Sequence, residues 1–292
     1  MEGHTIYYME NRGFAFLFHF FMFTIGGLRH CEGKRPRIYI PYLRPSLKEF
    51  DRKIVESLCS EEKDLNPTKD FPLDYNWKNL DVHYEICDLL KDKYEFLFTL
   101  EDFPNLESYT VVKCHGEPDT TWYKAFPFLK SLFEEIVGHA SLNPTQYVYI
   151  TRKGSQSISL HKGKLVRCIL NEEELLDTLT PLGFQCIQLE TLSFPDKIRL
   201  FQSSKIVLAP NTAALMFCLF SNKDSHIIEM IPRYIVGQYN THWDQTQYQT
   251  MCEYMNLSYT RFQQFREVED NLNAVIETEA LYQCITYFQN AA

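Results

Sequence analysis

Three apolar runs decide the fold: Tyr147-Val148-Tyr149-Ile150, Lys205-Ile206-Val207-Leu208-Ala209 and His226-Ile227-Ile228-Glu229-Met230. Each run is short and rich in β-branched or aromatic residues, which predicts a strand. The runs alternate with segments of helical character. Strands that alternate with helices are typical of βαβ units, in which the strands form a parallel sheet. The sequence therefore predicts an α/β fold.

Polar side chains stand at the carboxyl ends of these predicted strands. Arg152 follows the first strand, Asn211 and Thr212 follow the second, and Glu229 lies near the end of the third. In open parallel sheets, ligands bind beyond the carboxyl ends of the strands. Cationic and polar groups gathered there suit an anionic ligand.

A series of motifs surrounds these residues, and its order is informative. The motifs are Tyr149-Ile150-Thr151-Arg152, the run 167–175, Leu182-Gly183-Phe184, the run 190–194, the run 200–204, the run 209–215 and Ile228-Glu229-Met230-Ile231-Pro232. This series resembles the carboxyl-terminal domain of glycosyltransferase family 61. The resemblance implies an α/β protein of GT-B architecture, in which two Rossmann-like domains face each other across a cleft.

The resemblance also suggests how the chain is divided. We expect an N-terminal Rossmann-like acceptor domain over residues 1–140 and a nucleotide-sugar-binding domain over residues 141–262. Apolar residues at roughly helical spacing predict a C-terminal helix within 263–292. That helix either returns to the first domain or packs on its own domain, and both alternatives stay open.

The N-terminal half has fewer clear signals. Residues 37–41, 94–100 and 109–114 predict strands, and the apolar periodicity of residues 122–139 predicts a helix. The polar stretch 60–79 is typical of a surface loop.

The resemblance assigns a set of residues to the donor diphosphate. When a nucleotide-sugar bond breaks, negative charge grows on the leaving phosphate, and cations or amide donors must stabilise it. Arg152 and Arg167 match the arginines of the family, and a guanidinium binds phosphate through two hydrogen bonds. Asn211, Thr212 and Ala213 stand where a strand meets a helix, whose free amides can hold a phosphate. We expect a double role for Asn211, as the helix cap and as a ligand contact. Surface arginines and ordinary N-capping by Asn211 are the plain structural alternatives.

Further assignments concern the nucleoside and sugar. The family has a glutamate that resembles an acceptor for a ribose or sugar hydroxyl, and Glu229 stands at its position. An exposed glutamate at a strand end is the plain structural alternative. We assign Ser193 to the same part of the ligand. Asn171 and the acidic run 172–174 match the residue preferences of a helix start, so we expect them to cap a helix that runs to Leu179.

The general base is less well defined. An inverting transferase needs a group that takes the proton of the acceptor hydroxyl. The family pattern begins with Asn11-Arg12-Gly13, but Phe14 and Phe18 stand where the family has His and Asp. His19 is one residue beyond the expected place, and His115 after a predicted strand is its rival. No Asp-x-Asp triplet is present, so we expect no metal and no cofactor besides the UDP-sugar co-substrate.

Composition excludes several classes. The net charge of −9 argues against a general nucleic-acid binder. The nine cysteines lack the spacing of zinc ligands, so we expect reduced thiols in an intracellular protein. The apolar run Gly13–Gly27 is shorter than the ~20 residues of a spanning helix. Residues 1–4 have neither the basic start nor the small-residue cleavage site of a signal peptide, so we do not expect one. We expect it to form a buried helix or helix-strand element.

These observations lead to three functional hypotheses. The first is an inverting, metal-independent glycosyltransferase that moves xylose, or next N-acetylglucosamine, from a UDP-sugar to a hydroxyl of a glycan acceptor. Such a protein would resemble the soluble viral or bacterial members of the family and act in the cytoplasm, in the host cytoplasm if viral. The second is an inactive relative that binds a nucleotide sugar or glycan. The third is another GT-B or Rossmann-like enzyme that acts on a phosphorylated small molecule.

Overall fold

The computed structural model divides the chain into two compact units, unit 1 over Met1–Leu132 and unit 2 over Phe133–Ala292. The structure describes residues 5–9, 20–40, 81–98, 109–114, 122–139, 143–153, 160–161, 164–165, 169–231, 242–266 and 273–291. Three predicted site residues, His19, His115 and Arg167, lie outside these ranges, as does the predicted loop 60–79.

Unit 1 contains a four-stranded parallel sheet with the order β3-β2-β1-β4. Its strands are β1 (Thr5–Met9), β2 (Arg37–Tyr39), β3 (Glu95–Leu97) and β4 (Thr110–Cys114). The predicted strands near 37–41, 94–100 and 109–114 are confirmed, and β1 is an additional strand. The chain moves outward from β1 to β3 and then crosses to β4 on the other side of β1. That reversal is the topological switch point of a Rossmann-like sheet.

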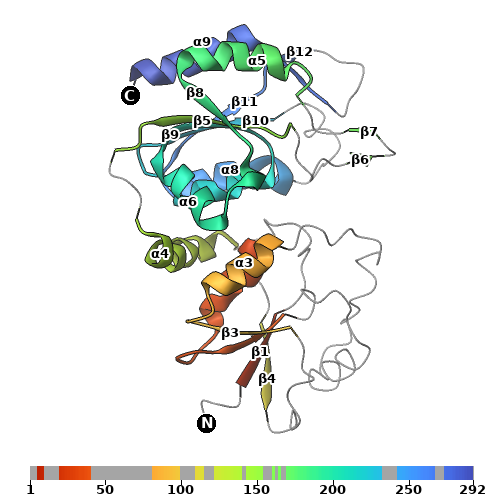
Figure 1. The fold of residues 1–292 in the computed structure, drawn as a ribbon, viewed down its shortest axis with the longest axis vertical. Helices are drawn as coiled ribbons and strands as arrows, with labels where there is room; N and C mark the ends of the chain where they lie inside the picture. Colours follow the sequence, from red (N-terminus) through yellow and green to blue (C-terminus); the bar gives the residue numbers. More distant parts are fainter. Residues whose placement is uncertain are drawn as a thin grey trace. The chain divides into compact units, whose positions relative to one another are not determined.

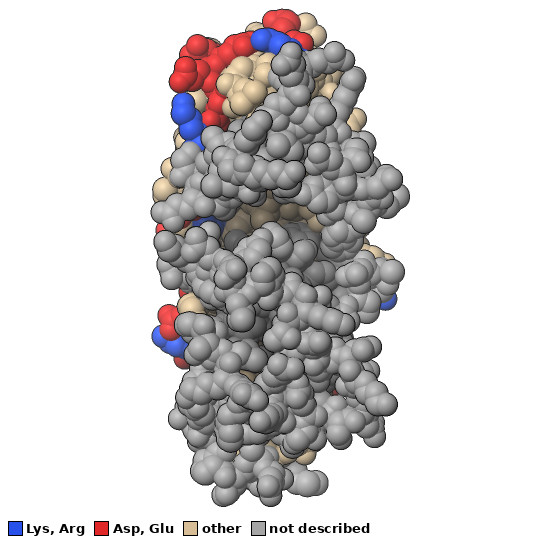
Figure 2. Space-filling model, turned by 90° about the vertical axis from the view of Figure 1, so that its right-hand side faces the viewer, with Lys and Arg blue, Asp and Glu red and all other residues tan. Residues whose placement is uncertain are grey.

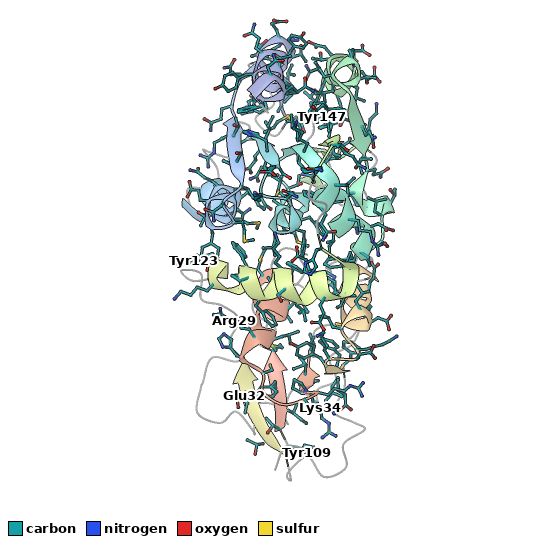
Figure 3. The ribbon with its side chains drawn as sticks, turned by 90° about the vertical axis from the view of Figure 1, so that its left-hand side faces the viewer. Arg29, Glu32, Lys34, Tyr109, Tyr123 and Tyr147 are labelled. Atoms are coloured by element: carbon teal, nitrogen blue, oxygen red, sulfur yellow. The ribbon has the colours of Figure 1, made fainter. Side chains whose placement is uncertain are left out.

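The helical segments of unit 1 are the π-helix η1 (Phe20–Ile25), the 3₁₀ helices η2 (Leu28–His30) and η6 (Trp122–Ala125), and the α-helix α3 (Asp81–Leu89). Among them, η1 and the turn after it pack closely on η6. A Cβ atom on Gly26 would lie 3.0 Å from the Cβ of Ala125, so this approach favours glycine. Arg29 donates to the carbonyl of Lys124 at 2.8 Å. Figure 3 labels Arg29 and Tyr123, the residue before Lys124 in η6. The described part of the run 13–27 is thus a buried helical element, as expected.

Helix α4 (Phe126–Val137) follows η6 directly. Together they confirm the helix predicted over 122–139.

Unit 2 contains a five-stranded parallel sheet with the order β11-β10-β9-β5-β8. Its strands are β5 (Gln146–Ile150), β8 (Phe184–Ile187), β9 (Ser204–Pro210), β10 (His226–Met230) and β11 (Ser258–Phe262). Numbered along the chain, the order is 2-1-3-4-5, which is a doubly wound sheet whose switch point lies between β5 and β9. All three strands that the sequence predicts here are confirmed. The two edge strands, β8 and β11, escape prediction because their residues are largely half-buried or exposed.

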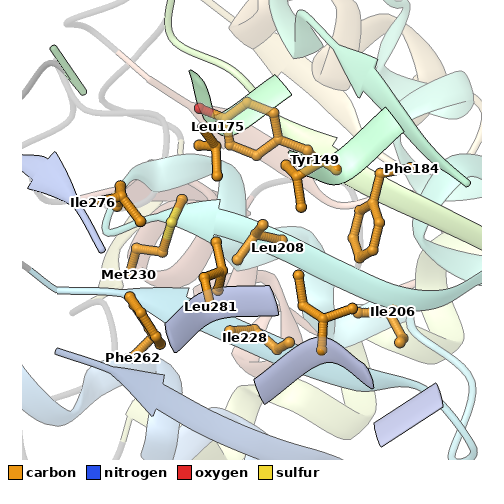
Figure 4. Close-up of a cluster of buried hydrophobic side chains, with 12 residues drawn as sticks. Tyr149, Leu175, Phe184, Ile206, Leu208, Ile228, Met230, Phe262, Ile276 and Leu281 are labelled. Carbon is orange, nitrogen blue, oxygen red and sulfur yellow. The ribbon is translucent and has the colours of Figure 1, made fainter. Parts of the chain in front are cut away.

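Helices cover both faces of this sheet (Figure 1). Helices α5 (Glu172–Leu179) and α9 (Thr278–Ala291) lie on one face, and α6 (Phe194–Ser203), η9 (Ala213–Phe220) and α8 (His242–Tyr254) lie on the other. The apolar core under α5 and α9 (Figure 4) comprises Tyr149, Leu175, Leu179, Phe184, Ile206, Leu208, Ile228, Met230, Phe262, Ile276, Leu281 and Ile285. The parallel sheet is therefore buried on both sides, as such sheets require.

Aromatic rings dominate the opposite face of the sheet. Phe217 of η9 lies with its ring centroid 5.3 Å from Phe194 and 5.8 Å from Phe201. Phe133 and Phe220 extend this cluster, with centroids 6.1 Å apart. All five side chains are at most 1% exposed. This aromatic cluster holds η9, and so supports the turn from β9 into η9.

The C-terminal segment differs from its prediction. Among the described residues of 263–292, the predicted helix is confirmed from Thr278 onward, whereas β12 (Phe265–Arg266) and β13 (Val275–Ile276) form an antiparallel pair. Val275 and Ile276 are β-branched, so they favour a strand although their spacing fits a helix. Helix α9 packs on α5, and Leu281 and Ile285 belong to the core of unit 2. The remaining short elements are β6 (Leu160–His161), β7 (Lys164–Leu165), η7 (Thr180–Leu182) and η8 (Leu189–Thr191).

A polar network joins α5 to this C-terminal segment. Arg266 donates to Glu174 at 2.6 Å, and the Thr278 hydroxyl donates to it at 2.7 Å. The hydrogen bond from Arg266 is the main reason that the pKa of Glu174 is lowered to about 2. Figure 2 shows acidic and basic side chains next to one another at the end of unit 2 that carries α5 and α9. Asn171 joins the same network through the backbone amide and carbonyl of Ile276, so its side chain does not cap α5 as predicted.

Two further predictions concern cysteines and the membrane. The six cysteines whose side chains the structure describes all carry free thiols, and three of them are buried. A membrane crossing needs a long apolar helix, and none of the helices within the described ranges provides one.

Candidate functional site

The switch point of the unit 2 sheet brings together two predicted site residues. Arg152 follows β5 and Asn211 follows β9, and these adjacent strands run parallel. Their carboxyl ends therefore meet at one edge of the sheet, which is where doubly wound folds bind ligands. The Asn211 amide donates to the carbonyl of Met230 at 3.0 Å, so β10 ends at the same edge.

A buried carboxylate holds the Asn211 side chain. Glu229 of β10 is 1% exposed. The side-chain amide of Asn211 donates to one of its oxygens, and the hydroxyl of Tyr259 in β11 donates to the other. Glu229 is therefore an internal acceptor, and its two oxygens face protein donors. The plain alternative of an exposed strand-end glutamate is wrong.

The surroundings of Glu229 shift its titration toward neutrality. Burial is the largest effect and raises its pKa from 4.5 to about 7, although the hydrogen bonds from Tyr259 and Asn211 and the charge of Arg261 lower it. Arg261 stands opposite Glu229 in the register of β10 and β11. Burial and the neighbouring carboxylate raise the pKa of Tyr259, so its hydroxyl keeps its proton at neutral pH. Proton uptake by Glu229 is therefore centred near pH 7.

The turn after β9 differs in detail from its prediction. The N-cap of η9 is Thr212, not Asn211, and no side chain caps the helix. The Asn211 side chain is drawn to Glu229 because a buried carboxylate needs donors. The first bond of η9 runs from Leu215 to the Thr212 carbonyl, so the amides of Ala213 and Ala214 have no acceptor within the helix. The Thr212 hydroxyl is buried and has no hydrogen-bond partner among the described residues.

A second buried carboxylate lies at the end of β5, and sequence reasoning missed it. Glu172, the first residue of α5, accepts hydrogen bonds from the hydroxyls of Tyr149, at 2.6 Å, and Thr151. The Lys153 amide donates to the Thr151 hydroxyl at 2.9 Å. These bonds fix the backbone on both sides of Arg152.

The sequence does contain a pattern that indicates the burial of Glu172. Glu172, Leu175 and Leu179 follow an i, i+3, i+7 pattern, and all three are buried. Glu172 thus lies on the apolar face of α5, whereas the acidic run 172–174 suggests only a helix start. The periodicity could have identified it as a buried, hydrogen-bonded group.

Removing this carboxylate is expected to destabilise unit 2. Glu172→Ala leaves the buried hydroxyls of Tyr149 and Thr151 without their acceptor, so we expect a loss of about 1 to 3 kcal/mol in the free energy of unfolding. Urea denaturation measures it. The matched control is Glu173→Ala, because the Glu173 side chain is 88% exposed and its ion pair within the described residues is with the exposed Lys153. Equal stability of the two variants would contradict the structural role of Glu172.

Ser193 has a structural role in the described geometry. It is the N-cap of α6, where its hydroxyl accepts from the Asp196 amide at 3.2 Å and donates to the Asp196 carboxylate at 2.6 Å. Within the described ranges, no three His, Cys, Asp or Glu side chains are grouped as metal ligands would be.

Comparison with known proteins identifies the family. The sequence matches the family model for Glycosyltransferase 61 over residues 18–228, which is more than half of its 292 residues. The match contains Arg152 and Asn211 and ends directly before Glu229. A search among curated proteins found no match. With its parallel, doubly wound sheet and the family match across both units, the chain belongs to glycosyltransferase family 61.

Proposed function

We propose that the protein is an inverting glycosyltransferase that moves a sugar from a UDP-sugar to a hydroxyl of a glycan acceptor. One observation carries the proposal: Arg152 and Asn211 follow the two strands that form the switch point of a doubly wound sheet in a chain of this family. The resemblance to family members favours UDP-xylose as donor, with UDP-N-acetylglucosamine next. The proposed place of action is the cytoplasm.

The proposed donor site stabilises the leaving group. As the bond between the sugar and UDP breaks, negative charge grows on the terminal phosphate. The Arg152 guanidinium can donate two parallel hydrogen bonds to that phosphate. The free amides of Ala213 and Ala214 add donors at the positive end of η9. Arg167 is proposed as a second cation. In this mechanism these donors do the work of a metal ion, so none is proposed.

The geometry refines the roles of the other predicted residues. Both oxygens of Glu229 accept from protein donors, so we propose that it orients Asn211 instead of binding a sugar hydroxyl itself. Asn211 then presents its remaining amide hydrogen or its oxygen to the donor. The Thr212 hydroxyl, which lacks a partner among the described residues, is proposed as a further contact.

The acceptor is proposed to bind unit 1, in the GT-B arrangement that the family resemblance implies. The carboxyl ends of β1 and β4 form the switch point of that sheet, and His115 directly follows β4 in the sequence. His115 and His19 remain the two candidates for the base. The base takes the proton of the acceptor hydroxyl, the acceptor oxygen bonds to the anomeric carbon, and UDP leaves from the opposite face with the bonding electron pair.

Calorimetric titration tests the donor site. We expect UDP and UDP-xylose to bind in the presence of a chelator, because the proposed phosphate ligands are protein groups. We expect GDP-mannose to bind at least about tenfold more weakly, a difference of about 1.4 kcal/mol. Binding of UDP-xylose without transfer to any glycan would favour an inactive relative. If no nucleotide binds, the proposed function is wrong.

A further inference from the structure

Tyr259 lies on a different strand from the residues assigned to the donor, yet it is connected to them. Its hydroxyl donates to Glu229, and the other oxygen of Glu229 accepts from Asn211. The Tyr259-Glu229-Asn211 chain of hydrogen bonds therefore runs from β11 through β10 to the turn after β9. We call it the relay. Each member is at least partly buried, so its bonds form in a medium of low dielectric.

We propose that Tyr259 is a positioning residue, which through Glu229 holds Asn211 in place for the nucleotide sugar, and that this hold weakens when Glu229 takes up a proton. The inference rests on the proposed donor site. It adds a dependence of donor affinity on pH that is built into the fold.

The hydrogen-bond inventory explains the proton dependence. An ionised carboxylate only accepts, and the side-chain NH₂ of Asn211, which faces Glu229, only donates. Both relay bonds are therefore charge-assisted when Glu229 is ionised, and such bonds are about twice as strong as neutral ones. A proton on Glu229 turns one oxygen into a donor, and in the described orientation of the Asn211 side chain the Tyr259 hydroxyl is the neighbour that can accept it. The Asn211 side chain then donates to a neutral oxygen. This hydrogen bond is weaker, so it fixes the turn after β9 less firmly.

The neighbouring groups leave Glu229 as the group that titrates near neutrality. Arg261 of β11 favours the carboxylate through its charge and donates to Gln249 of α8 at 3.3 Å. Cys218 of η9 faces Glu229, and Cys252 of α8 lies beside Cys218. Burial raises the pKa of Cys218 well above its usual value, so this thiol stays neutral. The pKa of Glu229, about 7, falls in the range where affinity is easily measured.

The expected dependence of affinity on pH follows from the direction in which the pKa of Glu229 moves. Nucleotide-sugar affinity is highest above pH 7, where Glu229 is ionised, and falls as pH drops below it. Tyr259→Phe removes a donor that favours the carboxylate. The midpoint of the affinity profile therefore moves up by about one pH unit. At pH 7 the variant binds several-fold more weakly, and above about pH 9 it binds within about twofold of wild type.

Calorimetric titration of UDP-xylose between pH 6 and pH 9.5 tests the proposal on wild type, Tyr259→Phe and Tyr254→Phe. The nucleotide sugar is the better probe, because the terminal phosphate of free UDP itself titrates near pH 6. Tyr254 is an exposed tyrosine of α8, so Tyr254→Phe should match wild type. Identical profiles for Tyr259→Phe and wild type would overturn the proposal. So would a loss of affinity by the same factor at every pH, because a merely structural role predicts that.

Thermal unfolding without ligand tests the titration of the relay independently of the donor site. The raised pKa of Glu229 stabilises the fold below pH 4.5, and this contribution is lost as pH rises through about 7. Tyr259→Phe raises the pKa further, so its stability deficit should grow between pH 6 and pH 8.5. A deficit that is constant with pH would overturn the relay. A growing deficit in a protein that binds no UDP-xylose would support the relay's titration but contradict the donor site.

Discussion

Replacing Arg152 with alanine is expected to lower kcat/KM for sugar transfer by a factor of about 10² to 10³, the usual effect of removing one donor that stabilises transition-state charge. Arg152 follows β5 at the switch point of the unit 2 sheet, where the diphosphate is proposed to bind. The loss should appear mainly in kcat, because the phosphate charge grows as the bond breaks. Arg152→Lys keeps the charge but not the planar fork, so it should recover only part of the activity.

Steady-state kinetics with UDP-xylose and a glycan acceptor measure this effect. The matched control is Arg199→Ala, because Arg199 lies on α6 and forms an exposed ion pair with Asp196 at 2.8 Å. That variant should retain wild-type activity. Urea denaturation of both variants shows whether the fold is intact. An active Arg152→Ala variant would remove Arg152 from the donor site and favour Arg167 as the phosphate ligand.

Phe217→Ala is expected to destabilise unit 2 by about 3 to 5 kcal/mol. The Phe217 ring is fully buried and lies among Phe194, Phe201 and Phe220, with centroids 5.3 to 6.4 Å away. Truncation removes these contacts and leaves a cavity, which the close-packed face of the sheet can only partly close. Because η9 begins directly after the turn at Asn211, nucleotide affinity should fall as well.

Urea denaturation followed by circular dichroism measures the loss of stability. Tyr287→Ala is the control, since the Tyr287 side chain on α9 is 68% exposed and its truncation should change stability by less than about 0.5 kcal/mol. A loss of less than about 1 kcal/mol for Phe217→Ala would mean that the aromatic cluster repacks around the gap. The turn at Asn211 would then not depend on this cluster.

Local patterns were sufficient for much of the fold. Three apolar runs predict β5, β9 and β10, and the apolar periodicity of residues 122–139 predicts η6 and α4, because strand and helix periods are properties of neighbouring residues. The order of strands and helices predicts parallel sheets, and the strand ends place Arg152 and Asn211 at one edge. The spacing of Val275 and Ile276 suggests a helix, but pairing with β12 makes them a strand.

The site has features that local sequence patterns do not predict. From sequence alone, Asn211 is a helix cap and ligand contact and Glu229 a strand-end acceptor, since each fits the preferences of its immediate neighbours. Burial under η9 and α8 keeps Glu229 away from bulk water. Its carboxylate therefore accepts hydrogen bonds from Asn211 and from Tyr259 of β11. Residues 30 positions apart in the chain meet only in the folded sheet. The sequence by itself determined the family, the parallel sheets and the strand ends that carry polar groups. Only the tertiary structure decided which of those groups are buried together, because burial and hydrogen-bond partners depend on contacts between distant segments.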